Sequence, residues 1–174
     1  GLVILPGKSV SGKSTLTAAL VSSGFTHVTD ELLLVDLPGG TLLGAPLAIG
    51  LKRGSWELGD GLFAQVQQLP VFHRQDGKAV RYLSPPVLCR DYGLGGVRTL
   101  VFPALAADER VSVQPLSVPE AFFRLTEAGY DSHRTLSRDD VARLFEWIGD
   151  MPAYELGYRD LARAVQEVAA LCEG

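Results

Sequence analysis

The sequence has few of the features that mark extracellular, metal-cluster or membrane proteins. Only two of its 174 residues are cysteine, Cys89 and Cys172, and they lack the paired spacing of a zinc site. We therefore expect two thiols in a reducing compartment. No run of eighteen apolar residues occurs, and the opening hexapeptide lacks the basic segment of a signal peptide. These absences favour a cytoplasmic protein without a membrane partner.

An excess of positive charge is also absent. The formal net charge is -4, so nothing in the charge suggests a nucleic-acid partner. With 47% apolar and 21% charged residues, the composition is that of an ordinary globular protein. A chain of this length can bury a substantial core, and we expect a single domain over residues 1–174.

One stretch near the N-terminus has a specific pattern. Residues 7–15 fit G-x-x-x-x-G-K-S/T, the pattern of a loop that binds nucleotide phosphates. The fixed places are occupied by Gly7, Gly12, Lys13 and Ser14. The apolar run at 2–5 predicts a strand before the loop, and residues 14–23 predict a helix after it, ended by Gly24. This is the strand, loop and helix context that the pattern requires.

The chemistry of such a loop explains its residue types. Backbone N–H groups must curl around an anion, so glycine is needed where the chain turns sharply or approaches the phosphates. The helix that follows adds its positive N-terminal end. We expect Lys13 to reach the outer phosphates of ATP and the Ser14 hydroxyl to bind Mg²⁺ or Mn²⁺. The residues expected to contact the nucleotide are Gly7, Ser9, Ser11, Gly12, Lys13, Ser14 and Thr15.

Two adjacent acids form the second informative feature. Asp30 and Glu31 directly follow residues 25–29, whose alternation predicts a short strand. A competing metal ligand is Asp36, because residues 32–36 alone look like a Walker B strand that ends in its aspartate. Asp36 adjoins a Pro-Gly-Gly turn, where aspartate also serves as a turn former. We therefore prefer Asp30 as the metal-binding acid.

The rest of the chain predicts an α/β fold with a mixed, partly antiparallel sheet, in which strands occupy the middle and helices cluster toward the C-terminus. Further strands are expected at 32–36, 41–43, 48–51, 79–83, 97–102 (stopped by Pro103) and 111–116, with turns at 37–40 and 75–78 and a short helix at 64–68. Helices are expected at 117–128, from Ser137, and from near Tyr158, the first two with capping boxes.

Other polar residues are weaker candidates. Lys52 and Arg53 are candidates for facing substrate or phosphate. Three arginines are candidates for stabilising charge, namely Arg90, Arg98 and Arg110. Among the histidines, His27 is expected to be structural, and His73 and His133 have no spacing that indicates a metal site.

Taken together, these residues resemble the catalytic domain of the bacterial HPr serine kinase/phosphorylase family. The spacing from Lys13 through Gly24 to Asp30 and Glu31 is the specific part of this resemblance, which covers nearly the whole chain. Residues 51–56, 101–103 and 154–156 look like the HPr-kinase-related group, some members of which sit beside peptide-modifying systems, including lasso peptide kinases. The resemblance implies the phosphoenolpyruvate-carboxykinase-like P-loop fold. It also allows a homo-oligomer, because the related regulatory enzymes are hexamers.

Carried onto this sequence, the resemblance implies that Asp30 holds the metal and that Glu31 accepts the proton of the attacking hydroxyl. Three positions depart from the family pattern: Glu31 replaces an aspartate, Tyr92 stands in place of an arginine, and Val10 replaces a loop glycine. These departures weaken the case for HPr itself as the substrate.

The sequence thus predicts a metal-dependent ATP kinase that phosphorylates a hydroxyl, most plausibly a serine of a protein or peptide. Two other functions are compatible with the same residues. One is a kinase for a small-molecule hydroxyl acceptor, and the other is a non-catalytic nucleotide-binding regulatory module.

Overall fold

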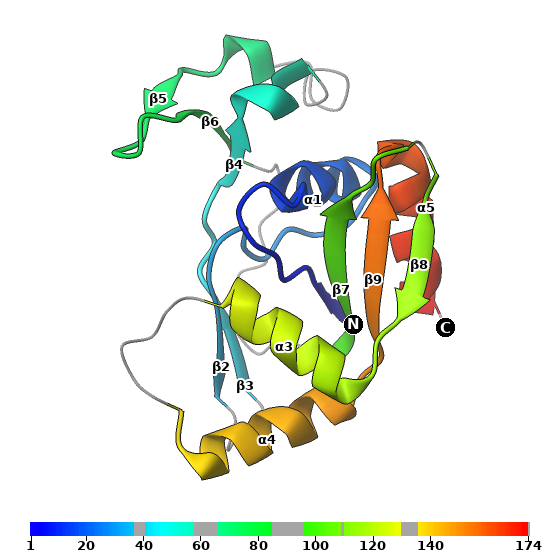
Figure 1. Ribbon diagram of the computed structural model, residues 1–174. Helices are drawn as coiled ribbons and strands as arrows, with labels where there is room; N and C mark the ends of the chain where they lie inside the picture. Colours follow the sequence, from blue (N-terminus) through cyan, green and yellow to red (C-terminus); the bar gives the residue numbers. More distant parts are fainter. Residues whose placement is uncertain (37–40, 58–65, 85–95, 109, 130–135, 174) are drawn as a thin grey trace. The chain divides into compact units, whose positions relative to one another are not determined.

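The computed structural model describes residues 1–36, 41–57, 66–84, 96–108, 110–129 and 136–173. The chain divides into two units, each built from separated segments. Figure 1 labels the helices and strands of both. Unit 1 comprises Gly1–Lys13, Val35–Leu42 and Gly93–Gly174, and unit 2 comprises Ser14–Leu34 and Leu43–Tyr92. Each unit is described by itself.

Unit 1 is organised around a four-stranded sheet with the order β1-β7-β9-β8. The central strands β7 (Val97–Leu105) and β9 (Ala153–Tyr158) are parallel, and β1 (Leu2–Ile4) adds a third parallel strand beside β7. The outer strand β8 (Ser112–Pro115) runs antiparallel to β9. The predicted mixed, partly antiparallel sheet is therefore confirmed.

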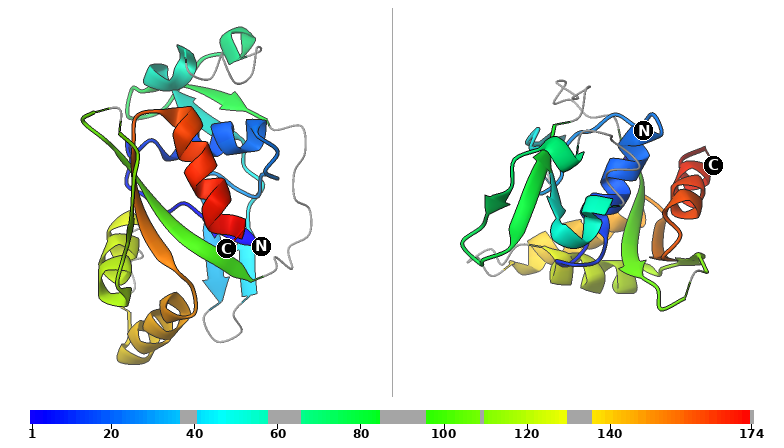
Figure 2. Two further views of the ribbon diagram at one scale, coloured as in Figure 1. Left: turned by 90° about the vertical axis from the view of Figure 1, so that its right-hand side faces the viewer. Right: turned by 90° about the horizontal axis from the view of Figure 1, so that it is seen from above.

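Helices cover both faces of this sheet (Figure 2). On one face, α3 (Val118–Ala128) and α4 (Arg138–Gly149) pack on alternate residues of β7 and β9. The buried centre of this layer consists of Leu100, Phe102, Ala121, Ile148 and Ala153. The opposite face carries α5 (Leu161–Glu173), which contacts β7 and β9 and buries Ala164 and Val168. Successive strand residues point to opposite faces, so each face has its own apolar set.

Unit 2 combines a helix with a small antiparallel sheet. Helix α1 is Lys13–Ser22, and the sheet has the order β4-β6-β5, with β4 at Ile49–Lys52, β6 at Ala79–Leu83 and β5 at Phe72–His73. Unit 2 also contains two 3₁₀ turns, η1 (Arg53–Ser55) and η2 (Val66–Gln68). Its fully buried core consists of Ala18, Ile49, Leu51, Val66 and Leu83. A further two-stranded sheet pairs β2 (Leu33–Asp36) with β3 (Thr41–Gly44).

Most predicted elements are confirmed within one or two residues. The capping box at Ser117 is present, with its N–H donating to the Glu120 carboxylate at 2.8 Å, and Ser137 with Asp140 forms the second. Gly24 ends α1 with φ +105°, a backbone conformation that favours glycine. The turn predicted at 37–40 and the start of the helix predicted at 64–68 lie outside the described residues. No helix in the described ranges has the length and apolarity needed to span a membrane.

The predicted stop at Pro103 is wrong, because β7 continues through it to Leu105. The N–H groups of Leu100 and Ala106 both donate toward β9, so the alternation places position 103 on the opposite edge of the strand. Pairing with β1 on that edge ends at Leu100. Proline is tolerated there because no neighbouring strand needs its missing N–H.

Two further predictions are wrong. The strand expected at 25–29 is irregular apart from a single bridge residue, His27, because a β-prone segment forms no ladder without a neighbouring strand. The last helix begins at Leu161 and not near Tyr158, which ends the unpredicted strand β9. Asp160 sets this start, since its carboxylate accepts the Arg163 N–H at 3.1 Å.

Candidate functional site

In unit 1, the loop that follows β1 has an unusual backbone. Val10 has φ +76° and Gly12 has φ +88°, both in the left-handed region. A β-branched residue is strained there, and Val10 is also 71% exposed, so it gains little from burial. The loop therefore adopts a conformation that its own sequence only partly favours.

Tyr158, at the end of β9, holds this loop from within unit 1. Its hydroxyl donates to the Gly12 carbonyl oxygen at 2.9 Å, and its side chain is 3% exposed. Burial raises the pKa of Tyr158 to about 12, so the hydroxyl keeps its proton and remains a donor. A Cβ added at Gly12 would clash with the Tyr158 hydroxyl and lie 3.1 Å from Leu105. Both the backbone angle and the space thus require glycine at position 12.

The earlier part of the loop is also tightly built. A Cβ at Gly7 would lie 2.6 Å from Ser11 Oγ, which is buried and has no hydrogen-bond partner among the described residues. A polar atom in that state is normally satisfied by water or a ligand. Lys8 forms an exposed ion pair with Glu127 at 3.2 Å. Ser9 is exposed and Lys13 is half-buried.

In unit 2, the first turn of α1 meets one of the two predicted acids. Ser14 Oγ donates to Asp30 Oδ2 at 3.1 Å, and the Gly50 N–H donates to the same oxygen at 3.0 Å. Asp30 is only 9% exposed. Two hydrogen bonds from neutral donors fix the position of this buried carboxylate. The serine of the loop pattern and the first acid are therefore brought together.

Thr15, the next residue of the pattern, is held by a different partner. Its Oγ1 donates to Ser55 Oγ at 2.7 Å, and Ser55 ends η1. The neighbouring Trp56 indole donates to the Leu51 carbonyl at 2.8 Å. The segment after β4 is thus fixed to the start of α1 by side-chain hydrogen bonds.

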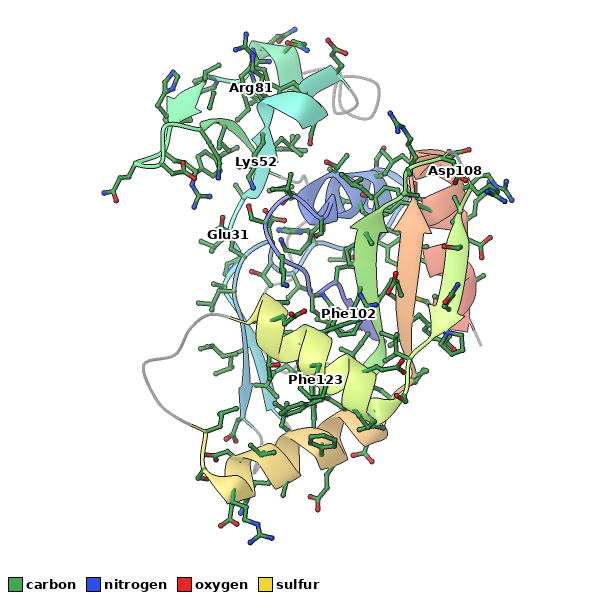
Figure 3. All side chains as sticks on the ribbon, in the orientation of Figure 1. Glu31, Lys52, Arg81, Phe102, Asp108 and Phe123 are labelled. Atoms are coloured by element: carbon green, nitrogen blue, oxygen red, sulfur yellow. The ribbon has the colours of Figure 1, made fainter. Side chains whose placement is uncertain are left out.

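Glu31 lies in different surroundings from Asp30. Its carboxylate is 52% exposed and forms an ion pair with Arg74, also half-exposed, at 3.3 Å. Glu31 is labelled in Figure 3. The adjacent acids therefore differ in kind: Asp30 is buried and hydrogen-bonded to Ser14, whereas Glu31 faces solvent with an arginine partner.

The weaker candidates are distributed as follows. Asp36 is exposed at the end of β2, and Lys52 ends β4 half-buried, beside the exposed Arg53. Arg110 pairs with Asp108 at 2.7 Å, and His73 is exposed on β5. His27 is buried with Nε2 2.9 Å from the Leu47 carbonyl oxygen, which confirms its structural role. Cys172 is half-buried on α5. Arg90, Tyr92, His133, Cys89 and the Arg98 side chain lie outside what the structure describes.

Sequence reasoning missed three residues that support the predicted ones, namely Tyr158, Ser55 and Arg74. Arg74 could have been suspected from its place before the Gln75-Asp76-Gly77 turn, but nothing local pairs it with Glu31. Tyr158 is 146 residues from its partner, and Ser55 is 40 residues from Thr15. These pairings depend on tertiary structure and leave no short-range pattern.

The donor set suits a hard divalent cation. Ser14 Oγ and Asp30 Oδ2 supply two oxygen atoms close enough to share one ion, and Mg²⁺ commonly takes only one or two protein ligands beside water and phosphate oxygens. In the part of the chain that the structure describes, no cluster of three or more His, Cys, Asp or Glu residues could hold a metal. Comparison of the chain with family models, curated proteins and solved structures finds no match.

Proposed function

We propose that this protein is a metal-dependent ATP kinase that transfers the γ-phosphate to a hydroxyl, most plausibly a serine of a peptide or protein. The observation that carries the proposal is the hydrogen bond between Ser14 and the buried Asp30. In nucleotide loops of this pattern, the serine hydroxyl and an aspartate hold the same magnesium ion. Asp36, the competing acid, is exposed at the end of β2.

The backbone of the loop supports the same proposal. Gly12 has a positive φ and no space for a Cβ atom. The Ser11 hydroxyl is buried and has no hydrogen-bond partner among the described residues. Successive N–H groups in such a conformation form a concave anion site. In this proposal residues 7–15 bind the phosphates, with Lys13 neutralising charge on the outer ones. The predicted P-loop fold belongs to this proposal too, since it rests on the loop and its flanking elements.

The transfer exchanges one bond to the γ-phosphorus for another. A bond forms between the acceptor oxygen and the γ-phosphorus, and the bond from that phosphorus to the β,γ-bridging oxygen breaks, so that ADP leaves. The hydroxyl proton passes to the Glu31 carboxylate and then to solvent. When bound, the divalent ion neutralises negative charge on the phosphates, and Ser14 and Asp30 would hold it.

Glu31 is exposed enough to exchange its proton with water after the transfer. Arg74 restricts where its carboxylate can lie, because the ion pair ties the two side chains together. The role of Glu31 as the base therefore makes Arg74 a positioning residue for it. Cytoplasmic localisation and the absence of a nucleic-acid partner remain part of the proposal.

Magnesium-dependent transfer of labelled γ-phosphate from ATP to fractionated host lysate tests this function. Asp30→Asn should reduce transfer by at least about a hundredfold, and the matched Asp36→Asn should stay within about twofold of the wild type. Glu31→Gln should keep ATP affinity and lose transfer by about a hundredfold or more. An acceptor band labelled equally by wild type and Asp30→Asn would refute the assignment.

ATP affinity separates the remaining alternatives. Lys13→Ala should weaken ATP binding at least about tenfold. An unchanged dissociation constant for ATP would refute both the kinase and the regulatory-module hypotheses. ATP binding without transfer to any fraction would favour the regulatory module. A labelled product of low molecular mass would favour a small-molecule kinase.

A further inference from the structure

The small sheet of unit 2 has two unlike faces. Ile49, Leu51 and Leu83 point to one face, where they form the core with Ala18 and Val66. Arg81 also lies on that side, with its guanidinium 4.3 Å from the centre of the Trp56 ring. The register places the alternate residues on the opposite face, which consists of Gly50, Lys52, Phe72, Val80 and Tyr82. We call this second set the ring face.

The ring face exposes aromatic surface. Phe72 is 50% exposed and Tyr82 is 39% exposed, and their ring centres are 5.7 Å apart. Val71, the residue before β5, is a further exposed apolar side chain. Lys52, labelled in Figure 3, adds a cationic side chain on the same face. Exposed aromatic pairs in a small sheet are the kind of surface that binds apolar side chains.

The ring face begins at the acid that the proposed function uses. The Gly50 N–H donates to Asp30 Oδ2, which places that carboxylate at the outer edge of β4. A Cβ built on Gly50 would lie 3.6 Å from Tyr82 Cε1 and 3.7 Å from Asp30 Oδ2. The Tyr82 ring and the Asp30 carboxylate therefore both lie next to Gly50. The Glu31–Arg74 ion pair joins the other acid to the residue that follows β5.

The width of the ring face gives a length scale for its occupant. Asp30 adjoins β4 and Phe72 belongs to β5, two strands away in the order β4-β6-β5. Neighbouring strands are about 4.8 Å apart, so β4 and β5 are about 10 Å apart, and Asp30 lies beyond the outer edge of β4. An extended peptide needs about three residues to cross from β4 to β5 and about one more to reach Asp30. A single small hydroxyl compound is too short to touch both ends.

We propose that the ring face seats the phosphate acceptor, and that the acceptor is a peptide segment with an apolar side chain two to four residues from its serine. The serine hydroxyl would lie next to Asp30, and the apolar side chain would pack on Phe72 and Tyr82. This inference rests on the proposed function, because groups beside the metal-binding acid lie on the γ-phosphate side of a nucleotide. It names the substrate class of that site.

Synthetic peptides can test this directly. In a serine peptide of otherwise Gly, Ala and Lys residues, one leucine is moved through positions one to five on either side of the serine. Initial rates of γ-phosphate transfer are measured for wild type, Phe72→Ala and Phe123→Ala. Phe123 is a matched control, since it is 67% exposed with a ring neighbour, Phe122, at 6.0 Å, and it lies on α3 of unit 1 (Figure 3).

The wild type should prefer leucine at positions two to four by about tenfold over leucine-free peptide, in keeping with the burial of one apolar side chain. Phe72→Ala should reduce that preference to within about twofold, and Phe123→Ala should keep it. Phe72→Leu, which retains apolar volume, should give an intermediate preference and supplies the test if Phe72→Ala does not fold. A preference that survives both substitutions overturns the inference.

Two further outcomes separate this inference from the proposed function. If N-acetylserine amide is phosphorylated as fast as every peptide, the acceptor site takes a small molecule. The inference of a peptide acceptor then fails, whereas the proposed kinase function stands. Transfer to lysate proteins with no positional preference among the peptides has the same consequence. If the wild type binds no ATP, the proposed function itself fails.

Discussion

Residues 7–13 in unit 1 and the start of α1 in unit 2 are held by different means. In unit 1 the loop up to Lys13 is fixed through its backbone, by a positive φ at Gly12 and by a tyrosine hydroxyl on the Gly12 carbonyl. In unit 2 the start of α1 is fixed through side chains, by hydrogen bonds from Ser14 to Asp30 and from Thr15 to Ser55. The loop motif names Ser14 and Thr15 but neither of their partners, Asp30 and Ser55. It does not name Tyr158 either, on which the backbone of the loop depends.

This difference predicts unlike responses to mutation. Gly12 combines a positive φ with close contact to Tyr158 and Leu105, so a side chain at this position, or loss of the Tyr158 hydrogen bond, should cost stability as well as binding. The hydrogen bond from the Ser14 hydroxyl to the Asp30 carboxylate should contribute modestly to the free energy of unfolding. Its loss should mainly affect magnesium-dependent ATP binding. The following substitutions test this contrast.

Gly12→Ala should have the largest effect. The alanine Cβ would clash with the buried Tyr158 hydroxyl and would occupy φ +88°, so we expect a loss of about 3 kcal/mol or more in the free energy of unfolding. Gly24→Ala is the matched control, because Gly24 has φ +105° but nothing within 4 Å of its Cβ position. It should lose only about 1 kcal/mol. Equal losses in urea titration would show that the clash is absent.

Tyr158→Phe should have the next largest effect. It leaves the Gly12 carbonyl without its hydroxyl donor, at a cost of about 1–3 kcal/mol in the free energy of unfolding. ATP affinity should fall with stability, because the same bond fixes the loop. Tyr154→Phe, on the same strand, is the control and should change both quantities little. A variant with unchanged ATP affinity would show that the loop does not depend on this bond.

The same tyrosine predicts a pH dependence. The pKa of Tyr158 is about 12 in the folded protein, compared with about 10 in an unfolded chain. Between these values the unfolded chain releases the proton and the folded protein keeps it, so stability falls as the pH rises. The contribution is complete below pH 10 and is lost as the pH rises through 12. The difference between wild-type and Tyr158→Phe stability should shrink across this window in urea titrations at each pH.

Ser14→Ala should affect ATP binding more than stability. Loss of the hydrogen bond to Asp30 should cost about 1 kcal/mol of stability, while magnesium-dependent ATP affinity falls about tenfold or more. Ser55→Ala, which removes the partner of Thr15, should cost a similar amount of stability and leave the response to EDTA intact. Calorimetric titration with ATP in magnesium and in EDTA separates the two variants.

Val10→Gly should have the smallest effect and should stabilise the protein. Glycine removes the strain of a β-branched residue at φ +76°, partly offset by the greater freedom of the unfolded chain, for a net gain of about 0.5–1 kcal/mol. Val10→Ala keeps a Cβ at the same backbone angle and should gain less. A Val10→Gly variant that melts below the wild type would show that the loop is not strained at this position.

Local signals predicted most of the fold. Strand alternation located β4 and β6, and two capping boxes placed the starts of α3 and α4, because these signals depend on neighbouring residues. Strand β9 was not predicted, although it is a central strand of the four-stranded sheet. Its residues, Ala-Tyr-Glu-Leu-Gly-Tyr, mix polar and apolar positions because Glu155 forms an ion pair with Arg124 of α3. An ion pair with a distant helix cannot be read from a strand pattern.

The candidate site was predictable to the same extent. Ser14 was expected from the loop pattern and Asp30 from its place after residues 25–29 and from the family resemblance, and the two side chains are hydrogen-bonded. The contrast between Asp30 and Glu31 was not predictable, because adjacent carboxylates look alike in a sequence. Burial on β4 and an ion pair with Arg74 distinguish them only after folding.

The hydrogen bond from Tyr158 to Gly12 also constrains the order of events during synthesis. The loop leaves the ribosome 146 residues before the hydroxyl that fixes it. The strands that connect them, β7 and β9, are themselves made in the second half of the chain. Such long-range parallel pairing is slow to form. The loop is therefore translated well before the strand whose tyrosine fixes its final conformation.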